Sequence, residues 1–224
     1  MSIKINYKNG VSKKHPNNLV LFTNEKFNIS NLKNYISKTE FSYINDLLKT
    51  SDLSKDLIVF EVSSKKKIIL ISIKNNLKTH AIENLGSKFY VSINYGKNSE
   101  YSINTDTIIS KHSNFIGYFI HGLKLKSYEF KKYKTKKETR IISLNIIGNK
   151  NNLSLKNQLR FKALEEGTFF ARDLVSEPGN ILHPDEYAKR INSLKKFGLR
   201  INIYDEKKLK KLGMNALLGV GQGS

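Results

Sequence analysis

Short apolar runs along the first 150 residues predict a sheet. Four of them are rich in β-branched residues and apolar at successive positions, a pattern typical of strands covered on both faces: Leu19–Phe22, Leu57–Val62, Lys67–Ile73 and Ile141–Ile147. Residues 31–48 place apolar side chains at helical spacing, and residues 108–123 do so less regularly because Gly117 and Gly122 interrupt them. Alternating strands and helices predict an α/β layer fold.

The pattern changes after the polar triplet at residues 150–152, which marks a junction. Ser154 is placed to cap a long helix with one apolar stripe, and Pro178 ends it because the residue before proline leaves helical geometry. The spacing further predicts a helix over 185–194, with Pro184 near its start, a strand over 199–204, and a helix over 205–212 that Gly213 closes. Residues 216–220 are expected to form a second strand of the same sheet.

The chain of 224 residues carries a formal net charge of +20, and five of its 39 basic residues are arginines. Residues 1–150 hold +15 of this charge. Such an excess can attract nucleic acid or anionic membranes, but a lysine-dominated excess beside abundant asparagine and isoleucine is also typical of a composition bias. The absence of cysteine excludes disulfides and thiolate metal sites. No run of about 18 apolar residues predicts a membrane span, and no apolar segment typical of a signal peptide follows Met1.

Residues 122–137 form a basic stretch interleaved with Tyr128, Phe130 and Tyr133. Lysines on phosphates and rings stacked on bases would make it a nucleic-acid surface. The alternative is a solvated connection whose rings pack into the core. The sequence leaves both interpretations open and favours the second.

Asp173 and Glu177 lie four residues apart, so a helix would place both carboxylates on one face. Paired carboxylates can bind a divalent ion, but two are too few for a closed site, and no histidine stands at ligand spacing. A polar helix end, with Glu177 and Asn180 capping the turn, is the preferred interpretation.

The glycine-rich residues 219–223 could cradle a phosphate, but they lack the lysine and hydroxyl pair of a P-loop, which favours a close-packed turn. The five histidines are scattered, and none forms a His-Glu-x-x-His pair: His15, His80, His112, His121 and His183. No nucleophile elbow is present, so no catalytic, metal-binding or cofactor-binding residue is predicted.

Two strings resemble the opening of the catalytic domain of the leucyl (cytosol) aminopeptidases, the M17 metallopeptidase family. They are Ala-Arg-Asp-Leu-Val-Ser-Glu-Pro-Gly-Asn-Ile-Leu-His at 171–183 and Leu-Gly-Met-Asn-Ala-Leu-Leu-Gly-Val-Gly-Gln-Gly-Ser at 212–224. Residues 122–137 also resemble the segment before the last strand of that family's N-terminal domain. Ser176 and Asn215 depart from the asparagine and glycine that the family usually has there.

The resemblance implies a macro-domain-like N-terminal domain over 1–150, a mixed sheet between helices. It further implies a linking helix over 151–177 and, over 178–224, the start of an α/β catalytic domain that stops before the active site. Full-length members remove N-terminal amino acids from peptides with two manganese or zinc ions and assemble as hexamers. For this chain, which shows neither a signal-peptide pattern nor a predicted membrane span, a soluble cytoplasmic protein is expected. The family's metal ligands follow the second string, so the resemblance implies that this chain alone is inactive. The alternative is a basic macro-like module that binds nucleic acid or a nucleotide without catalysis.

Overall fold

The computed structural model describes residues 2–8, 18–95, 99–135, 140–150 and 152–222. The chain divides into two compact units, residues 1–169 and residues 170–224.

A six-stranded sheet organises the first unit, with strand order β1-β6-β5-β2-β4-β3. Neighbouring strands run parallel except β3, which pairs antiparallel with β4. The strands are β1 (Ser2–Tyr7), β2 (Asn18–Asn24), β3 (Leu57–Ser63), β4 (Lys66–Ile73), β5 (Ser99–Asn104) and β6 (Ile141–Ile147). The helices are η1 (Ser30–Leu32), α1 (Lys38–Leu48), α2 (Thr79–Ile93), η2 (Thr105–Thr107), α3 (Phe115–Lys126) and α4 (Leu155–Ser176), of which α4 continues into the second unit.

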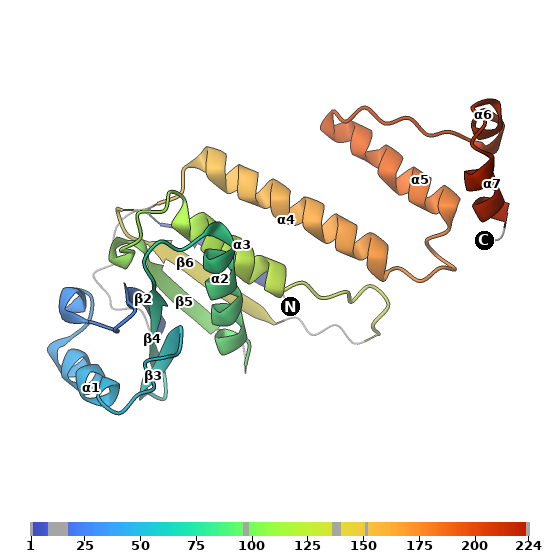
Figure 1. Cartoon of the computed structure of the whole chain (residues 1–224). Helices are drawn as coiled ribbons and strands as arrows, with labels where there is room; N and C mark the ends of the chain where they lie inside the picture. Colours follow the sequence, from blue (N-terminus) through green and yellow to red (C-terminus); the bar gives the residue numbers. More distant parts are fainter. Residues whose placement is uncertain (1, 9–17, 96–98, 136–139, 151, 223–224) are drawn as a thin grey trace. The chain divides into compact units, whose positions relative to one another are not determined.

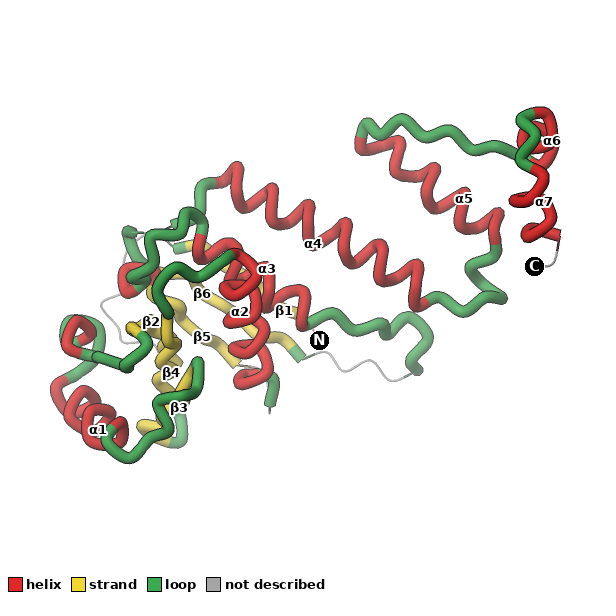
Figure 2. The backbone as a smooth tube through the Cα atoms, in the orientation of Figure 1, coloured by secondary structure: helices red, strands yellow, loops and turns green. Residues whose placement is uncertain are grey.

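Helices cover both faces of this sheet (Figures 1 and 2). Val20 and Phe22 of β2 face a core built with α2, α3 and the first half of α4. Their neighbours Leu19 and Leu21 face a second core built with η1 and α1. Successive side chains of a strand point to opposite faces, so an uninterrupted apolar run supplies both cores. The predicted α/β class, with a mixed sheet between helices, is confirmed.

All four strands predicted within the first 150 residues are present, but the bounds of the two helices predicted there were wrong. The stretch 31–48 is two elements, because Ser37 is extended and caps α1 by accepting a hydrogen bond from the backbone N–H of Glu40. The stretch 108–123 becomes helical only from Phe115, after Asn114 in left-handed geometry (φ 60°). The long helix after the junction is confirmed, and the Ser154 hydroxyl accepts from the Asn157 N–H at its start (3.4 Å).

The second unit is helical throughout its regular parts: α5 (Pro184–Asn192), η3 (Ser193–Phe197), α6 (Glu206–Lys211) and α7 (Asn215–Gln222). The helices predicted over 185–194 and 205–212 are confirmed as α5 and α6. Gly213 follows α6 in left-handed geometry, with φ 71°. Both predicted strands were wrong. Residues 199–204 are irregular and 216–220 lie within α7. An alternating pattern forms a strand only when a partner strand takes its backbone hydrogen bonds, and no ladder in the described chain includes residues 199–204.

Two glycines allow α2 and α3 to approach backbone to backbone. A Cβ atom added at Gly86 of α2 would lie 1.8 Å from the carbonyl oxygen of Phe119, and one added at Gly122 of α3 would lie 2.0 Å from that of Glu83. Gly86 and Gly122 thus set the spacing of the two helices on the sheet, although Gly122 had weakened the helix prediction over 108–123.

We expect Gly86→Ala to destabilise the protein by more than about 2 kcal/mol, because the new methyl group must push the two backbones apart. Gly167→Ala is the matched control. It also replaces a helical glycine, but its Cβ meets nothing within 4 Å. Helix propensity alone then predicts a gain of about 0.5–1 kcal/mol. Denaturant unfolding of both variants checks this, and equal effects would contradict the close approach.

Candidate functional site

A cavity of about 340 Å³ opens in the first unit between β1, α3 and the first half of α4. Its walls are mostly apolar, and a few polar groups converge on it, the usual composition of a small-molecule site. It is lined by Ile5, Tyr7, Ile120, His121, Lys124, Leu155, Gln158, Leu159, Phe161, Lys162, Glu165 and Glu166.

A partly buried ion pair lies in this cavity. Lys124 Nζ is 3.1 Å from Glu165 Oε1, with the two side chains 17% and 21% exposed. The same ammonium donates to the carbonyl of Ile3 on β1 (3.3 Å). The pair therefore ties α3 to both α4 and the edge strand, and its charges cancel inside the cavity.

His121 brings a polar group that the described protein does not satisfy. Its Nδ1 lies 2.8 Å from Glu83 Oε1. Its Nε2 is buried and has no hydrogen-bond partner within the described part of the chain. Buried polar atoms nearly always have a partner, so this nitrogen calls for an explanation. The Phe161 ring packs beside the imidazole, with the ring centroids 5.8 Å apart.

Tyr7 lines the cavity from β1 and remains 36% exposed. Burial raises the pKa of its phenol from 10.0 to about 12. The phenol therefore stays neutral at physiological pH. It can donate or accept a hydrogen bond at the cavity but supplies no charge there.

A second cavity, of about 510 Å³, lies where β4 ends. It is lined by residues 73–77 and 109–112. Lys74 and Lys111 bring positive charge to it, although Lys74 Nζ also lies 3.5 Å from Asp56 Oδ1. Ligands of open α/β sheets commonly bind at the carboxyl ends of the strands, which is where this cavity lies.

The basic stretch 122–137 does not form one surface. Lys124 is paired in the first cavity, and Tyr128 packs on Phe169 of α4 (ring centroids 5.2 Å apart). Phe130 contacts Tyr133, which is exposed. Residues 136 and 137 lie outside the described residues. The ring contacts favour the interpretation as a packed connection.

Asp173 and Glu177 do not form a cation site with a third ligand. Glu177 Oε1 accepts from Arg190 Nη1 (2.7 Å), and Arg190 Nε donates to Glu186 Oε1 (2.9 Å). The Glu177 side chain is 1% exposed, so this arginine–carboxylate cluster joins the end of α4 to α5. Among the described residues, no three or more His, Cys, Asp or Glu side chains could share a metal ion.

The remaining sequence candidates separate in space. Residues 219–222 are helical, so neither the phosphate loop nor the turn predicted for 219–223 is found there, and 223 lies outside the described residues. His112 Nε2 lies 3.3 Å from the Thr79 hydroxyl, and His183 precedes α5. His80 lies in the first turn of α2, and His15 lies outside the described residues. Within the described parts, no helix combines the length and apolarity that crossing a bilayer requires.

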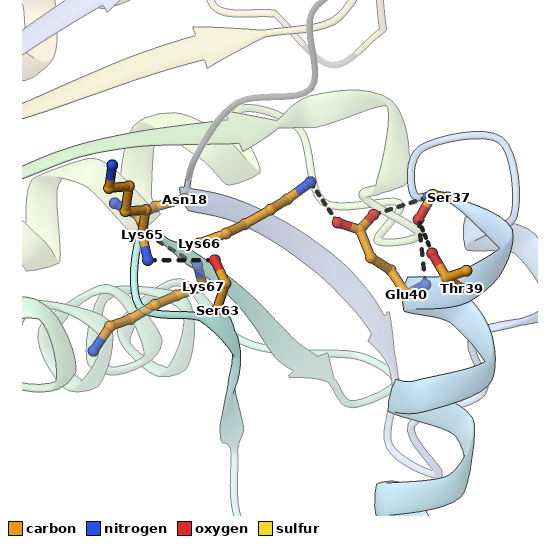
Figure 3. A network of polar contacts seen from close by, with 8 residues as sticks. All are labelled: Asn18, Ser37, Thr39, Glu40, Ser63, Lys65, Lys66 and Lys67. Carbon is orange, nitrogen blue, oxygen red and sulfur yellow. Dashed lines mark hydrogen bonds and ion pairs between the residues drawn. The ribbon is translucent and has the colours of Figure 1, made fainter.

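Glu40 has the perturbed acidity that often marks an active site, but its partners are structural (Figure 3). Lys66 Nζ lies 2.5 Å from its Oε1, and the Ser37 N–H donates to its Oε2 (2.9 Å). Burial alone would raise the pKa of this carboxyl, but the hydrogen bonds from Lys66 and Ser37 outweigh it and hold the pKa below its ordinary value. The cluster completes the capping box of α1 and ties that helix to β4.

Comparison with known proteins points to one family. Residues 169–224 match the family model described as "Cytosol aminopeptidase family, catalytic domain". A probable cytosol aminopeptidase of Bradyrhizobium sp. is 42% identical over 107 residues, which is 46% of this chain and 21% of that protein. The Agrobacterium fabrum protein of the same name is 42% identical over 112 residues, 47% of this chain and 22% of its own length. The matched stretch thus spans little more than a fifth of these relatives.

Solved structures match more of the chain, at lower identity. A mutant of tomato leucine aminopeptidase aligns with a TM-score of 0.71 at 17% identity, covering 95% of this chain and 46% of that one. The cytosol aminopeptidase of Coxiella burnetii aligns with a TM-score of 0.61 at 13% identity, covering 92% and 41%. The bottromycin maturation enzyme BotP in complex with Mn aligns with a TM-score of 0.61 at 14% identity, covering 88% and 40%. At these identities the alignments establish the fold.

We expect Glu40→Gln to lower the free energy of unfolding by about 1–2 kcal/mol at pH 7, because Lys66 loses its charged partner. The folded pKa of Glu40 lies below its unfolded value. Its contribution is therefore full above the unfolded pKa, about 4.3, and is lost as the pH falls through the folded pKa.

Denaturant unfolding of the unmodified protein and of Glu40→Gln between pH 7 and pH 3 checks this. The difference between their free energies of unfolding should vanish at the acid end of this range. Asp46→Asn is the control, because Asp46 makes an exposed pair with Lys49 on the same helix. A gap that stays constant with pH would contradict the ion-pair explanation.

Proposed function

Because this chain belongs to the cytosol aminopeptidase family, M17, we propose that it supplies the N-terminal portion of a leucyl aminopeptidase, an enzyme that removes N-terminal amino acids from peptides. The observation that carries this proposal is the match of residues 169–224 to the family's catalytic domain. Two probable cytosol aminopeptidases support it, with 42% identity over 107 and 112 residues. Their name also supports a cytoplasmic location.

The second unit has the surface of a part of a larger domain. No residue of 170–222 is buried as a whole in this chain, although the Glu177 side chain is, and large apolar side chains are widely exposed. They include Val175, Tyr187, Phe197, Leu199, Ile203, Tyr204, Leu212, Met214, Leu217 and Val220. So many exposed large apolar side chains are typical of a segment that contributes to an interface or to one side of a core. This supports the proposal that the second unit packs against further catalytic-domain structure in a whole enzyme.

For the whole enzyme we propose a pair of manganese or zinc ions and a hexameric assembly. Such a metal pair would polarise the scissile carbonyl and activate the attacking water. The described residues do not fit this role, because no three or more of their His, Cys, Asp or Glu side chains could share one ion. No catalytic step is therefore assigned to a residue of this chain. The exposed apolar side chains of the second unit are its proposed contribution.

We expect the purified 224-residue chain not to hydrolyse a leucyl-anilide in the presence of Mn²⁺, so that neither leucine nor the free aniline is released. The reason is the missing donor set, and elemental analysis of the same sample should find no stoichiometric manganese or zinc. A full-length family member assayed in parallel is the positive control. Turnover proportional to chain concentration, together with two bound ions per chain, would contradict the proposal.

A second candidate function is a nucleic-acid or nucleotide-binding module. Two observations favour it: residues 1–150 carry a net charge of +15, and the 510 Å³ cavity at the end of β4 contains Lys74 and Lys111. Lysines neutralise phosphates without contacting the bases, so such binding would not depend on the base sequence of the nucleic acid.

This alternative predicts gel shifts with duplex DNA or RNA whose affinity falls steeply as salt rises. Lys74→Gln with Lys111→Gln should weaken binding about tenfold or more, since each removed phosphate contact lowers both affinity and salt slope. Lys207→Gln with Lys208→Gln removes the same charge from α6 and is the matched control. Absence of binding at low salt, or equal loss in the two double variants, would reject the cavity as a phosphate site.

A further inference from the structure

The first cavity combines an apolar wall with opposite charges on neighbouring helices. Ile5, Ile120, Leu155, Leu159 and Phe161 form the wall. The volume of about 340 Å³ lies at the small end of ligand sites, which run from about 300 to 1,000 Å³. Such a space suits a compact molecule with one apolar group.

The ion pair in the cavity can serve a ligand of both charges. An ammonium has three hydrogens, and Lys124 directs two of them to Ile3 and Glu165. The third can go to an acceptor on a ligand, while Glu165 can accept from a ligand donor. A ligand with a net charge would leave one charge uncompensated in this partly buried space, which is costly. A zwitterion keeps the balance.

His121 supplies a further acceptor. Its Nδ1 faces the Glu83 carboxylate, which only accepts, so the hydrogen of the neutral ring resides on Nδ1. Nε2 is then an acceptor, and the described protein offers it no donor. An ammonium group held by Glu165 could supply one. Together, the cavity presents the acceptors Nε2 and Glu165, the donor Lys124 and an apolar wall.

We propose that this cavity binds a free apolar α-amino acid such as leucine, with its carboxylate on Lys124, its ammonium between Glu165 and His121, and its side chain on the wall formed with Leu159 and Phe161. The site lies wholly within the first unit and uses no residue of the matched catalytic-domain segment. It is therefore independent of the proposed peptidase role. The N-terminal residue of a peptide shares the ammonium and side chain but lacks the adjacent carboxylate.

The test is a nuclear magnetic resonance titration of the full 224-residue chain with leucine and four analogues, each lacking one group. Glycine lacks the side chain, 4-methylpentanoate the ammonium and isoamylamine the carboxylate. Leucinamide keeps the ammonium but carries the uncharged amide of a peptide N-terminus. We expect leucine to bind with a Kd on the order of 1 mM, a value in keeping with its size, and every analogue to bind at least about tenfold more weakly.

Three variants locate the site. Glu165→Gln should weaken leucine binding about tenfold, because the ammonium loses a charged acceptor. Leu159→Trp should abolish it by filling the cavity from α4, and it changes no charge. Lys49→Met removes a lysine from an exposed pair on α1 and should leave binding unchanged. Circular dichroism and thermal unfolding of each variant separate loss of the site from loss of the fold.

No saturable shifts with leucine at about ten times the expected Kd would overturn the proposal. Binding that survives Leu159→Trp in a folded protein would overturn it as well. Leucinamide binding as tightly as leucine would replace the free amino acid by a peptide N-terminus and so reject the zwitterion assignment.

Discussion

Side chains of β2 and β4 are buried on both faces of the sheet, and the other features of the first unit follow from that burial. A strand apolar at every position cannot leave either face in water, so helices must cover both. On one face α1 and η1 cover the strands, and the Glu40–Lys66 pair joins α1 to the first residue of β4. On the other face α2 and α3 must fit side by side over the strands. Gly86 and Gly122 make this possible by removing the side chains that would separate the two backbones.

The close approach of α2 and α3 in turn positions the polar groups of the first cavity. Glu83 lies one turn before Gly86, and its carboxylate reaches His121, the residue beside Gly122. Lys124 follows along α3 and meets Glu165 of α4. Gly117, also on α3, makes room for the Phe161 ring, which forms part of the cavity wall. The glycines of α3 thus set the packing of the helix on two sides and fix the direction from which its polar side chains enter the cavity.

The sequence predicted the central strands because their signal is local. Each carries most of its apolar residues within about seven positions, with few polar residues between them because both faces are buried. β5 was missed because its sequence, Ser-Glu-Tyr-Ser-Ile-Asn, has no such run and becomes a strand only between β2 and β6. Residues 199–204 show the opposite case, an alternating pattern without a ladder partner in the described chain. A periodic pattern specifies which side chains share a face, whereas strand formation also needs a neighbour that is distant in sequence.

The difference between local and distant signals also explains why the sequence pointed to a family but not to the cavity. The strings at 171–183 and 212–224 are continuous in sequence, so the resemblance to the aminopeptidase family could be found without coordinates. The cavity joins β1, α3 and α4, and its ion pair links residues 41 positions apart. Lys124 also lies in a basic stretch where its charge gives no sign of a partner. The apolar side chains of the second unit are readable in the sequence as well, but the patterns over 199–204 and 216–220 assigned them to strands. In this chain these side chains are exposed, in the irregular segment and in α7. Local periodicity therefore indicated which residues are apolar but specified neither a partner surface nor the secondary structure that such a surface would induce.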